Sequence, residues 1–313
     1  MSAAVRIGLA TAATAWEQDE DAPLLVPALR QLGVRAEPVV WDDPAVDWSG
    51  YDLVVVRSTW DYTSRLDEFL AWAARVEDVT RLANPSQVLR WNTDKRYLGR
   101  LAADGVSAVP TTYLLADDPA SRRRAEDPFA ITDDGADIVI KPTVSAGSKD
   151  TARHAPGEQA SATRHALALL DAGRDVMVQP YLTGVDDHGE TGMVFLRGEF
   201  SHGFRKGPLL VGGAADVDGL FALEQIDPRA PSDAEIALGR TAVAACARHT
   251  GVDDLLYARI DVLPGPTGSP ILLEAELTEP SLFLEQSPGA AERAATAIAA
   301  VARGQAEPPG PAV

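Results

Sequence analysis

Three apolar runs and two helical patterns share the first 85 residues, and their order restricts the fold more than any other feature. The last run, residues 51–58, reads YDLVVVRS, which is typical of a parallel strand buried on both faces. Strands connected by helices predict a small open α/β domain that ends near Pro85. The strand patterns cover residues 5–12, 35–41 and 51–58, and the helical patterns cover residues 21–33 and 65–77.

Sequence motifs and charge argue against several functions for this domain. The first run lacks the G-x-G-x-x-G fingerprint of dinucleotide sites, and the 313 residues contain no G-x-x-x-x-G-K-[ST] phosphate loop. A net charge of −18 repels nucleic acid and anionic membranes. The basic stretch SRRRAEDP (121–128) turns acidic at once and predicts a solvated surface loop. We expect no nucleic-acid or membrane partner.

The cellular location is predicted from three features. The N-terminus has no basic segment and soon turns acidic, unlike a signal peptide, and no apolar run is long enough to span a membrane. The single cysteine, Cys246, cannot form an internal disulfide and is expected to be a core thiol on an Ala-rich helix. These features predict a cytoplasmic protein.

The remaining 228 residues or so alternate between short strands and helices. Residues 92–106 predict a helix with Asn92 or Thr93 near its N-cap and Lys95 near its start. The tail from residue 306 is rich in Pro and Gly and is expected to be disordered. Further strands are expected within residues 109–115, 137–144, 175–182 and 192–206, and further helices over residues 233–250 and 289–304.

Residues 257–280, YARIDVLPGPTGSPILLEAELTEP, predict a β-hairpin, because two apolar runs flank a turn rich in Gly and Pro. Arg259 and Asp261 share one face of the first strand, as Glu274 and Glu276 do on the second. If Asp261 lies opposite Glu274, all four charges share one surface. Clustered carboxylates favour a divalent cation such as magnesium, which prefers oxygen ligands. The alternative is a solvent-exposed hairpin face.

Lys141 ends the apolar strand pattern IVIK, so its ammonium group is expected to be buried and to need an anionic partner. The loop PTVSAGSKDT follows, and backbone amides of such small residues can close over phosphates. Next comes VMVQPYL, an apolar strand pattern that leads into a hinge.

This ordered set resembles the ATP-grasp superfamily over roughly residues 85–305, and the α/β domain before it also fits. The resemblance rests on Lys95, the strand Lys141-Pro142, the Gly/Ser loop, the Q-P-Y-L hinge, R-x-D, and E-x-E in place of the commoner E-x-N. It implies an α/β protein with a small parallel-sheet domain before two α+β lobes. The implied divisions are 1–88, 89–182 for the small lobe, 183–305 for the metal-binding lobe, and the tail 306–313.

The resemblance also implies ATP and two Mg²⁺ ions as cofactors. Arg259 would steady the transferred phosphoryl group, and Lys206 would bind phosphate or substrate. ATP would be held through its phosphates, a flexible lid, the adenine slot and the ribose by Lys95, Lys141, Ser145, Ala146, Gly147, Ser148, Gln179, Tyr181, Leu182 and Glu190. The metal ligands would be Asp261, Glu274 and Glu276.

Four stretches are similar to a subgroup of the superfamily that includes cycloserine synthetase, the cyclo-ligase acting on O-ureido-D-serine. They are RSTWDY, NPSQVLRWNTDKRYL, SHGFRK and LLEAELTEPSLFL. RSTWDY also follows a strand whose C-terminal end is a common place for α/β sites, so Arg57 could grip a substrate carboxylate. The alternative is that these side chains pack a domain interface. The expected substrate set is Arg57, Ser58, Trp60, Asp61, Tyr62 and His202.

The function that this resemblance implies is ATP-dependent ligation. A substrate carboxylate would become an acyl phosphate, and a nitrogen of the same amino-acid-like molecule would displace the phosphate. An intermolecular amino-acid or peptide ligase and an ATP-binding protein without catalysis remain alternatives, and a homodimer is left open. No general base stands out in the sequence.

Overall fold

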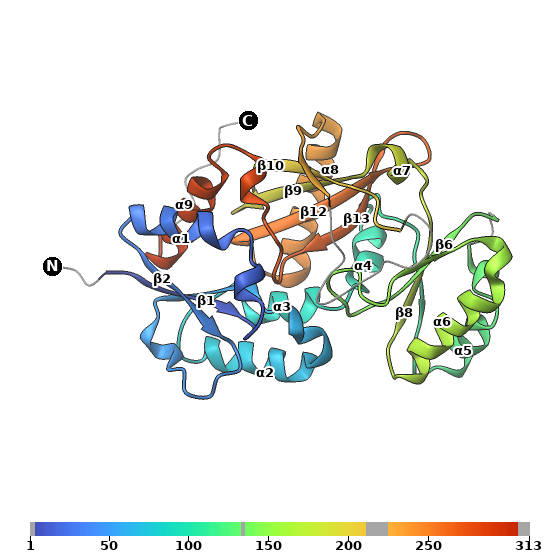
Figure 1. Ribbon diagram of the computed structural model, residues 1–313, viewed down its shortest axis with the longest axis horizontal. Helices are drawn as coiled ribbons and strands as arrows, with labels where there is room; N and C mark the ends of the chain where they lie inside the picture. Colours follow the sequence, from blue (N-terminus) through green and yellow to red (C-terminus); the bar gives the residue numbers. More distant parts are fainter. Residues whose placement is uncertain (1–3, 133–134, 211–224, 306–313) are drawn as a thin grey trace.

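Three β-sheets form the framework of the molecule in the computed structural model, which describes residues 4–132, 135–210 and 225–305 (Figure 1). Each sheet draws its strands from one stretch of the chain, so the sheets follow one another along the sequence. The expected disorder of residues 306–313 concerns a tail that lies outside the described residues. No helix in the described ranges is both long and apolar enough to cross a membrane.

The first sheet is parallel, as the sequence predicts. Its third strand is buried at every residue, because side chains pack on both of its faces. Helix α1 (Ala22–Gln31) and helix α2 (Leu66–Glu77) turn their buried side chains toward it. In spatial order its strands are β2 (Arg35–Val40), β1 (Arg6–Thr11), β3 (Leu53–Ser58) and β4 (Leu82–Ala83).

The second sheet is antiparallel and carries Lys141. Helices α5 (Pro119–Ala125) and α6 (Gln159–Asp171) pack on it through an apolar cluster that includes Ile138 and Ile140. The stretch 121–128, expected as a loop, instead begins within α5, where Ser121 and Ala125 are buried. In spatial order the strands are β5 (Thr112–Leu114), β8 (Val176–Pro180), β6 (Ile138–Pro142) and β7 (Ala152–His154).

The third sheet is antiparallel and contains the expected hairpin. Helix α8 (Asp233–Thr250) begins and ends where the sequence predicts, with a Ser232–Glu235 capping box and Gly251 in the left-handed region. Cys246 is fully buried on it. In spatial order the strands are β11 (Ile226–Pro228), β10 (Glu199–Lys206), β9 (Glu190–Leu196), β12 (Tyr257–Pro264) and β13 (Pro270–Glu276).

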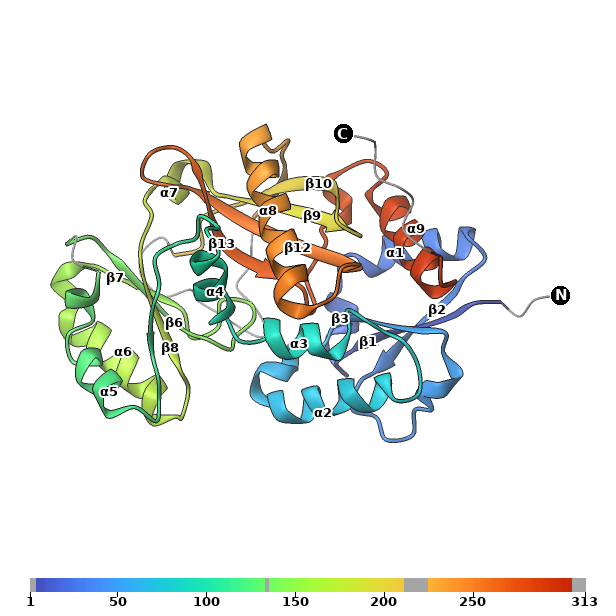
Figure 2. The same cartoon turned by 180° about the vertical axis from the view of Figure 1, so that it is seen from behind.

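The predicted single helix over residues 92–106 is wrong. The chain forms helix α3 (Ser86–Asn92) and helix α4 (Tyr97–Ala103), and Lys95 lies in the turn between them (Figure 2). Both helices pack beside α8, in a core with β9 and β12 of the third sheet. Residues 86–106 therefore share a core with the third sheet, although we expected residues from 89 onward in the small lobe.

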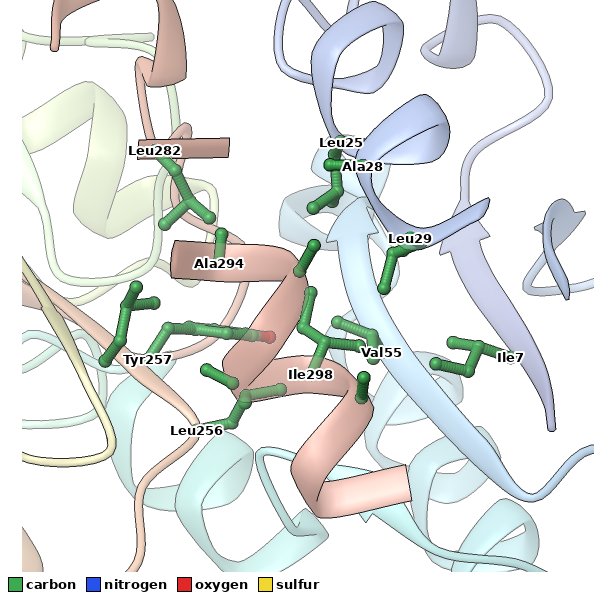
Figure 3. Packing of buried hydrophobic residues seen from close by; sticks show 14 of the residues in the cluster. Ile7, Leu25, Ala28, Leu29, Val55, Leu256, Tyr257, Leu282, Ala294 and Ile298 are labelled. Carbon is green, nitrogen blue, oxygen red and sulfur yellow. The ribbon is translucent and has the colours of Figure 1, made fainter. Parts of the chain in front are cut away.

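Helix α9 (Ala290–Ala302) joins the first and third sheets in one core (Figure 3). Ala294 and Ile298 pack among Leu25 and Leu29 of α1, and Tyr257 of β12 belongs to the same cluster. Polar bonds also cross this boundary. The Tyr257 hydroxyl lies 2.9 Å from the Val56 carbonyl oxygen, and the Asn84 amide donates to the Tyr257 and Leu277 carbonyls. The base of the hairpin is thereby fixed to the N-terminal sheet.

Candidate active site

A cavity of about 330 Å³ lies where the three sheets meet. The hairpin β12–β13 forms one wall, β6 and β8 form another, and residues of the N-terminal domain close one end. The cavity collects most of the residues expected to act, from stretches far apart in the sequence. These are Trp60, Tyr62, Lys95, Lys141, Ser145, Ala146, Gly147, Ser148, Gln179, Tyr181, Leu182, Glu190, Lys206, Arg259, Asp261, Glu274 and Glu276.

The strand register places the four charges of the hairpin on one surface. Asp261 lies opposite Glu274 and Arg259 lies opposite Glu276. The register shifts by one residue immediately after Asp261, which is where the charged face ends. All four side chains line the cavity, which disfavours the alternative of a solvent-exposed hairpin face.

Cations from the hairpin and from β10 neutralise this surface. Arg259 Nη2 donates to Asp261 Oδ2 at 2.9 Å and also pairs with Glu276. Lys206 Nζ lies 3.2 Å from Asp261 Oδ2 and 3.3 Å from Glu190 Oε2. Arg259 and Asp261 are 5% and 1% exposed, so these pairs act with little screening by water.

The three hairpin carboxyls differ in their affinity for a proton. Burial works against ionisation of Asp261, but Arg259 and Lys206 outweigh it and lower its pKa. Burial opposes ionisation of Glu274 too, and Lys95 and Lys141 overcome it. For Glu276, burial and repulsion by the other two carboxylates prevail over Arg259 and raise the pKa to about 7. Glu276 is therefore the hairpin carboxyl that gives up its proton least readily.

Two lysines act on Glu274, Lys95 from the turn between α3 and α4 and Lys141 from strand β6. Lys95 Nζ donates to the Ser145 carbonyl at 2.6 Å and lies 3.3 Å from Glu274 Oε1. Asn92 fixes the turn that carries Lys95, because its amide donates to the Ala275 carbonyl and accepts from the Leu277 amide, each at 2.7 Å. The lysine is thus attached through its turn to strand β13.

Lys141 behaves differently from Lys95. It is 8% exposed and lines the cavity, and it forms no ion pair with any residue in the described ranges. Burial lowers its pKa, the attraction of Glu274 opposes this, and the nearby charge of Lys95 adds to it. The expected anionic partner is therefore Glu274 acting at longer range, and the ammonium group can accept an anion from the cavity.

An apolar slot opens beside these charges. Tyr181 and Leu182 follow β8, and they pack with residues of β6, α7 (Gly184–His188) and the hairpin. Gln179 is 2% exposed and its amide donates to Thr111 Oγ1 at 2.8 Å, so its side chain shapes the wall. The loop 145–148 borders the same space. The apolar lining consists of Val109, Val139, Tyr181, Leu182, Val185, Leu263 and Leu273.

Arg57 does not line the cavity. Its guanidinium is 3% exposed, donates to Asp21 Oδ2 at 2.9 Å and to the Pro280 carbonyl at 3.1 Å, and lies 3.6 Å from Asp19. This is the alternative that the sequence left open, an arginine packed at a domain interface. The side chain holds the N-terminal domain against the segment after β13.

Three more residues of the expected substrate set also lie outside the cavity lining. Ser58 bonds the hydroxyl of Thr11 at 2.8 Å, and Asp61 accepts from the Trp41 indole at 2.9 Å. His202 lies 2.8 Å from the Leu282 carbonyl, and burial lowers its pKa. Trp60 and Tyr62 are the members of that set that reach the cavity.

Sequence reasoning missed three carboxyls of the cavity wall, Glu20, Asp21 and Glu279, of which Glu279 follows the hairpin. Glu279 is 8% exposed. Burial and repulsion by Glu276 raise its pKa to about 8. The available signal was a third acid, in LTEP, three residues beyond the E-x-E pair.

The carboxylates of the hairpin have the oxygen donors that magnesium prefers. Among the residues that the structure describes, however, no three His, Cys, Asp or Glu side chains form a group poised to hold a metal. The reason is visible in the contacts, since Lys95, Lys206 and Arg259 already occupy the carboxylate oxygens. Metal binding here would require these ion pairs to rearrange.

Comparisons with known proteins are consistent with this arrangement. Residues 7–84 match the family described as D-cycloserine synthetase DcsG, N-terminal domain. The cycloserine biosynthesis protein DcsG of Streptomyces lavendulae is 40% identical over 297 residues, which cover 94% of this chain and 97% of that protein.

Solved structures extend the comparison to the fold. The crystal structure of D-cycloserine synthetase DcsG superposes with a TM-score of 0.87 at 39% identity, covering 95% of this chain and 99% of the other. The ATP-grasp ligase PsnB with its minimal precursor gives a TM-score of 0.62 at 17% identity, covering 95% and 99%. The expected ATP-grasp fold is confirmed.

Proposed function

Because the chain belongs to the D-cycloserine synthetase family, we propose that it is an ADP-forming ligase of cycloserine biosynthesis. The substrate is an amino-acid-like molecule, and O-ureido-D-serine closing to D-cycloserine is the reaction that we propose. Similarity over 94% of the chain supports this assignment, since it covers all three sheets and every wall of the cavity.

The proposal that ATP binds in this cavity rests mainly on Lys141. A buried ammonium group without a close carboxylate is suited to a phosphate, and Lys95 lies nearby to share the charge. The loop 145–148 can cover the phosphates with its backbone amides, while the slot formed by Tyr181 and Leu182 suits a purine ring. We therefore place ATP between β6 and the hairpin.

Asp261, Glu274 and Glu276 are the residues that we propose to hold magnesium, as two ions delivered with ATP. Bound magnesium would neutralise charge that develops on the phosphoryl oxygens. The donor set fits, because the three carboxyls lie on one face of the hairpin and line the cavity, and carboxylate oxygens are the ligands that magnesium prefers.

The residues then have separate tasks in the two steps. In the first step a substrate carboxylate oxygen attacks the γ-phosphorus and ADP leaves; Arg259 and Lys206 stabilise the transferring phosphoryl group. In the second step the ureido nitrogen next to the oxygen attacks the acyl carbon, and phosphate leaves with one original carboxylate oxygen. Water then removes the carbamoyl group from that nitrogen, as carbon dioxide and ammonia, which gives the D-cycloserine ring. Arg259 also donates to the Ser281 carbonyl at 3.2 Å, which fixes its position for both steps.

The test is turnover with a panel of amino-acid analogues. The purified chain with ATP and magnesium should release phosphate with O-ureido-D-serine alone, and mass spectrometry should find the cyclised product. Phosphate release only after a second amino acid or a peptide is added would support an intermolecular ligase instead. Absence of ATP turnover across the panel would contradict the proposal.

A further inference from the structure

Glu279 lies at the end of the cavity nearest the N-terminal sheet. It is 8% exposed, and the hydroxyl of Tyr62, from the N-terminal domain, lies near it and favours its ionised form. An ionised carboxyl offers about four acceptor positions, so one hydroxyl leaves most of its capacity unused. The side chain is therefore placed to accept further bonds from a molecule in the cavity.

Glu279 has no ion-pair partner in the described part of the chain, in contrast to the carboxyls of the hairpin. Lys95 attracts it from a distance but is bonded to Ser145 and Glu274, and Arg57 is held by Asp21. A carboxyl that is buried without a cation is costly to ionise, and its raised pKa, about 8, reflects that cost. A cationic ligand would remove the cost.

The surroundings of Glu279 favour the same kind of ligand. The aromatic residues Trp60 and Tyr62 of the N-terminal domain line the cavity, and Glu20 and Asp21 of the same domain line it as well. Aromatic faces and carboxylates both attract an ammonium group, and both disfavour a carboxylate. Arg57, the residue that could have reversed this preference, is neutralised outside the cavity.

We propose that this end of the cavity is a subsite for the amino group of the substrate, with Glu279 as counter-ion and Trp60 and Tyr62 as walls. The inference rests on the proposed function and deepens it, because it sets the direction in which the amino acid lies. The amino group points toward the N-terminal sheet, and the carboxyl group points toward Lys206 and Arg259, where the phosphoryl group is transferred.

The test is calorimetric binding to the full chain saturated with magnesium and a non-hydrolysable ATP analogue. Two ligands are compared, O-ureido-D-serine and the same molecule without its α-amino group. The unmodified protein should bind the amino-bearing ligand at least tenfold more tightly. Glu279→Gln should lose at least tenfold for that ligand and less than twofold for the other, so the preference disappears.

Matched variants separate this role from a structural one. Glu285→Gln makes the same change at an exposed position six residues along, and it should keep the preference. Glu279→Asp keeps the charge and should restore part of it. If Glu279→Gln does not fold, Tyr62→Phe, which removes the hydroxyl that favours the ionised form of Glu279, should still reduce the preference about threefold.

Several outcomes overturn the subsite. They are equal binding of both ligands by the unmodified protein, a preference that survives in Glu279→Gln, and an equal loss for both ligands. The proposed reaction fails separately. A tenfold preference without ADP formation contradicts the reaction alone, whereas turnover without any preference contradicts the subsite alone.

Discussion

The two ends of the cavity carry opposite charges that lack a close ion-pair partner. The end beside β6 carries the ammonium group of Lys141, and the end beside the N-terminal sheet carries the carboxyl of Glu279. Between them, Asp261 pairs with Arg259 and Lys206, and Glu274 pairs with Lys95. A polyanion belongs at the first end and a cation at the second, which is how one cavity can orient ATP and an amino acid toward each other.

The largest effect is expected at Arg57, whose guanidinium is held by Asp19 and Asp21 and so adds no positive charge to the second end of the cavity. Arg57→Met should lower the free energy of unfolding by about 3–5 kcal/mol, because it leaves Asp21 and Asp19 buried without their cation. Chemical denaturation measures this. Arg75→Met, an exposed arginine on α2, should stay close to the unmodified protein. A stable Arg57→Met protein with weakened substrate binding would instead restore the substrate role expected from the sequence.

The paired centre of the cavity is tested by Asp261→Asn. The substitution removes the carboxylate that joins Arg259 to Lys206, and turnover of ATP should fall about 10³-fold. Steady-state phosphate release measures the loss. Asp253→Asn makes the same change in the exposed loop before β12 and should keep full activity. Equal rates for the two variants would show that the hairpin carboxylates do not take part in phosphoryl transfer.

The cationic end is tested by Lys141→Met. Nucleotide affinity should fall about 10²-fold, because a buried ammonium group that binds phosphate is lost, while the side chain keeps its length. Calorimetry with ATP and magnesium measures the affinity. Arg164→Met, an exposed cation on α6 of the same lobe, should bind ATP normally. Unchanged affinity in Lys141→Met would place the phosphates elsewhere.

The anionic end has a pH signature in the ligand-free protein. The pKa of Glu279 is about 8 in the folded chain, against an ordinary value of 4.5. The folded state thus retains a proton that the unfolded state releases. The resulting stability is fully present below about pH 4.5 and is lost as the pH rises through 8.

Glu279→Gln should remove this dependence. Between pH 5 and pH 7 the unmodified protein should lose about 2 kcal/mol more stability than the variant, as the difference between the two pKa values requires. Denaturation at several pH values measures it, with Glu285→Gln as the matched control. Parallel pH profiles for the unmodified protein and Glu279→Gln would mean that Glu279 is already neutralised.

The sequence predicts the hairpin half of the site well, and physical reasons explain why. Alternation along a strand is a local property, so the shared face of Arg259, Asp261, Glu274 and Glu276 could be predicted without knowing the rest of the fold. The role of Lys141 could be predicted in the same way, because an ammonium group at the end of a buried apolar strand needs an anionic partner. The parallel N-terminal sheet and helix α8 follow from similarly local patterns.

The N-terminal half of the site depends on partners far away in sequence. Arg57 is removed from the cavity by Asp21 and by the Pro280 carbonyl, 223 residues further on, and Glu279 approaches Tyr62 only after the domains pack. The break between α3 and α4 has the same origin. Asn92 was expected near the start of a helix, but it is the last residue of α3, where its side chain bonds the backbone of Ala275 and Leu277.

The most direct test of carboxylate activation is the fate of the carboxylate oxygens. Substrate labelled with ¹⁸O in its carboxyl group should transfer one labelled oxygen to the released phosphate, and ADP should form in equal amount. Mass spectrometry of the phosphate reads this in a single turnover. Label retained wholly in the product, with no ADP formed, would contradict attack of the carboxylate on the γ-phosphorus and, with it, the orientation that the two ends of the cavity impose.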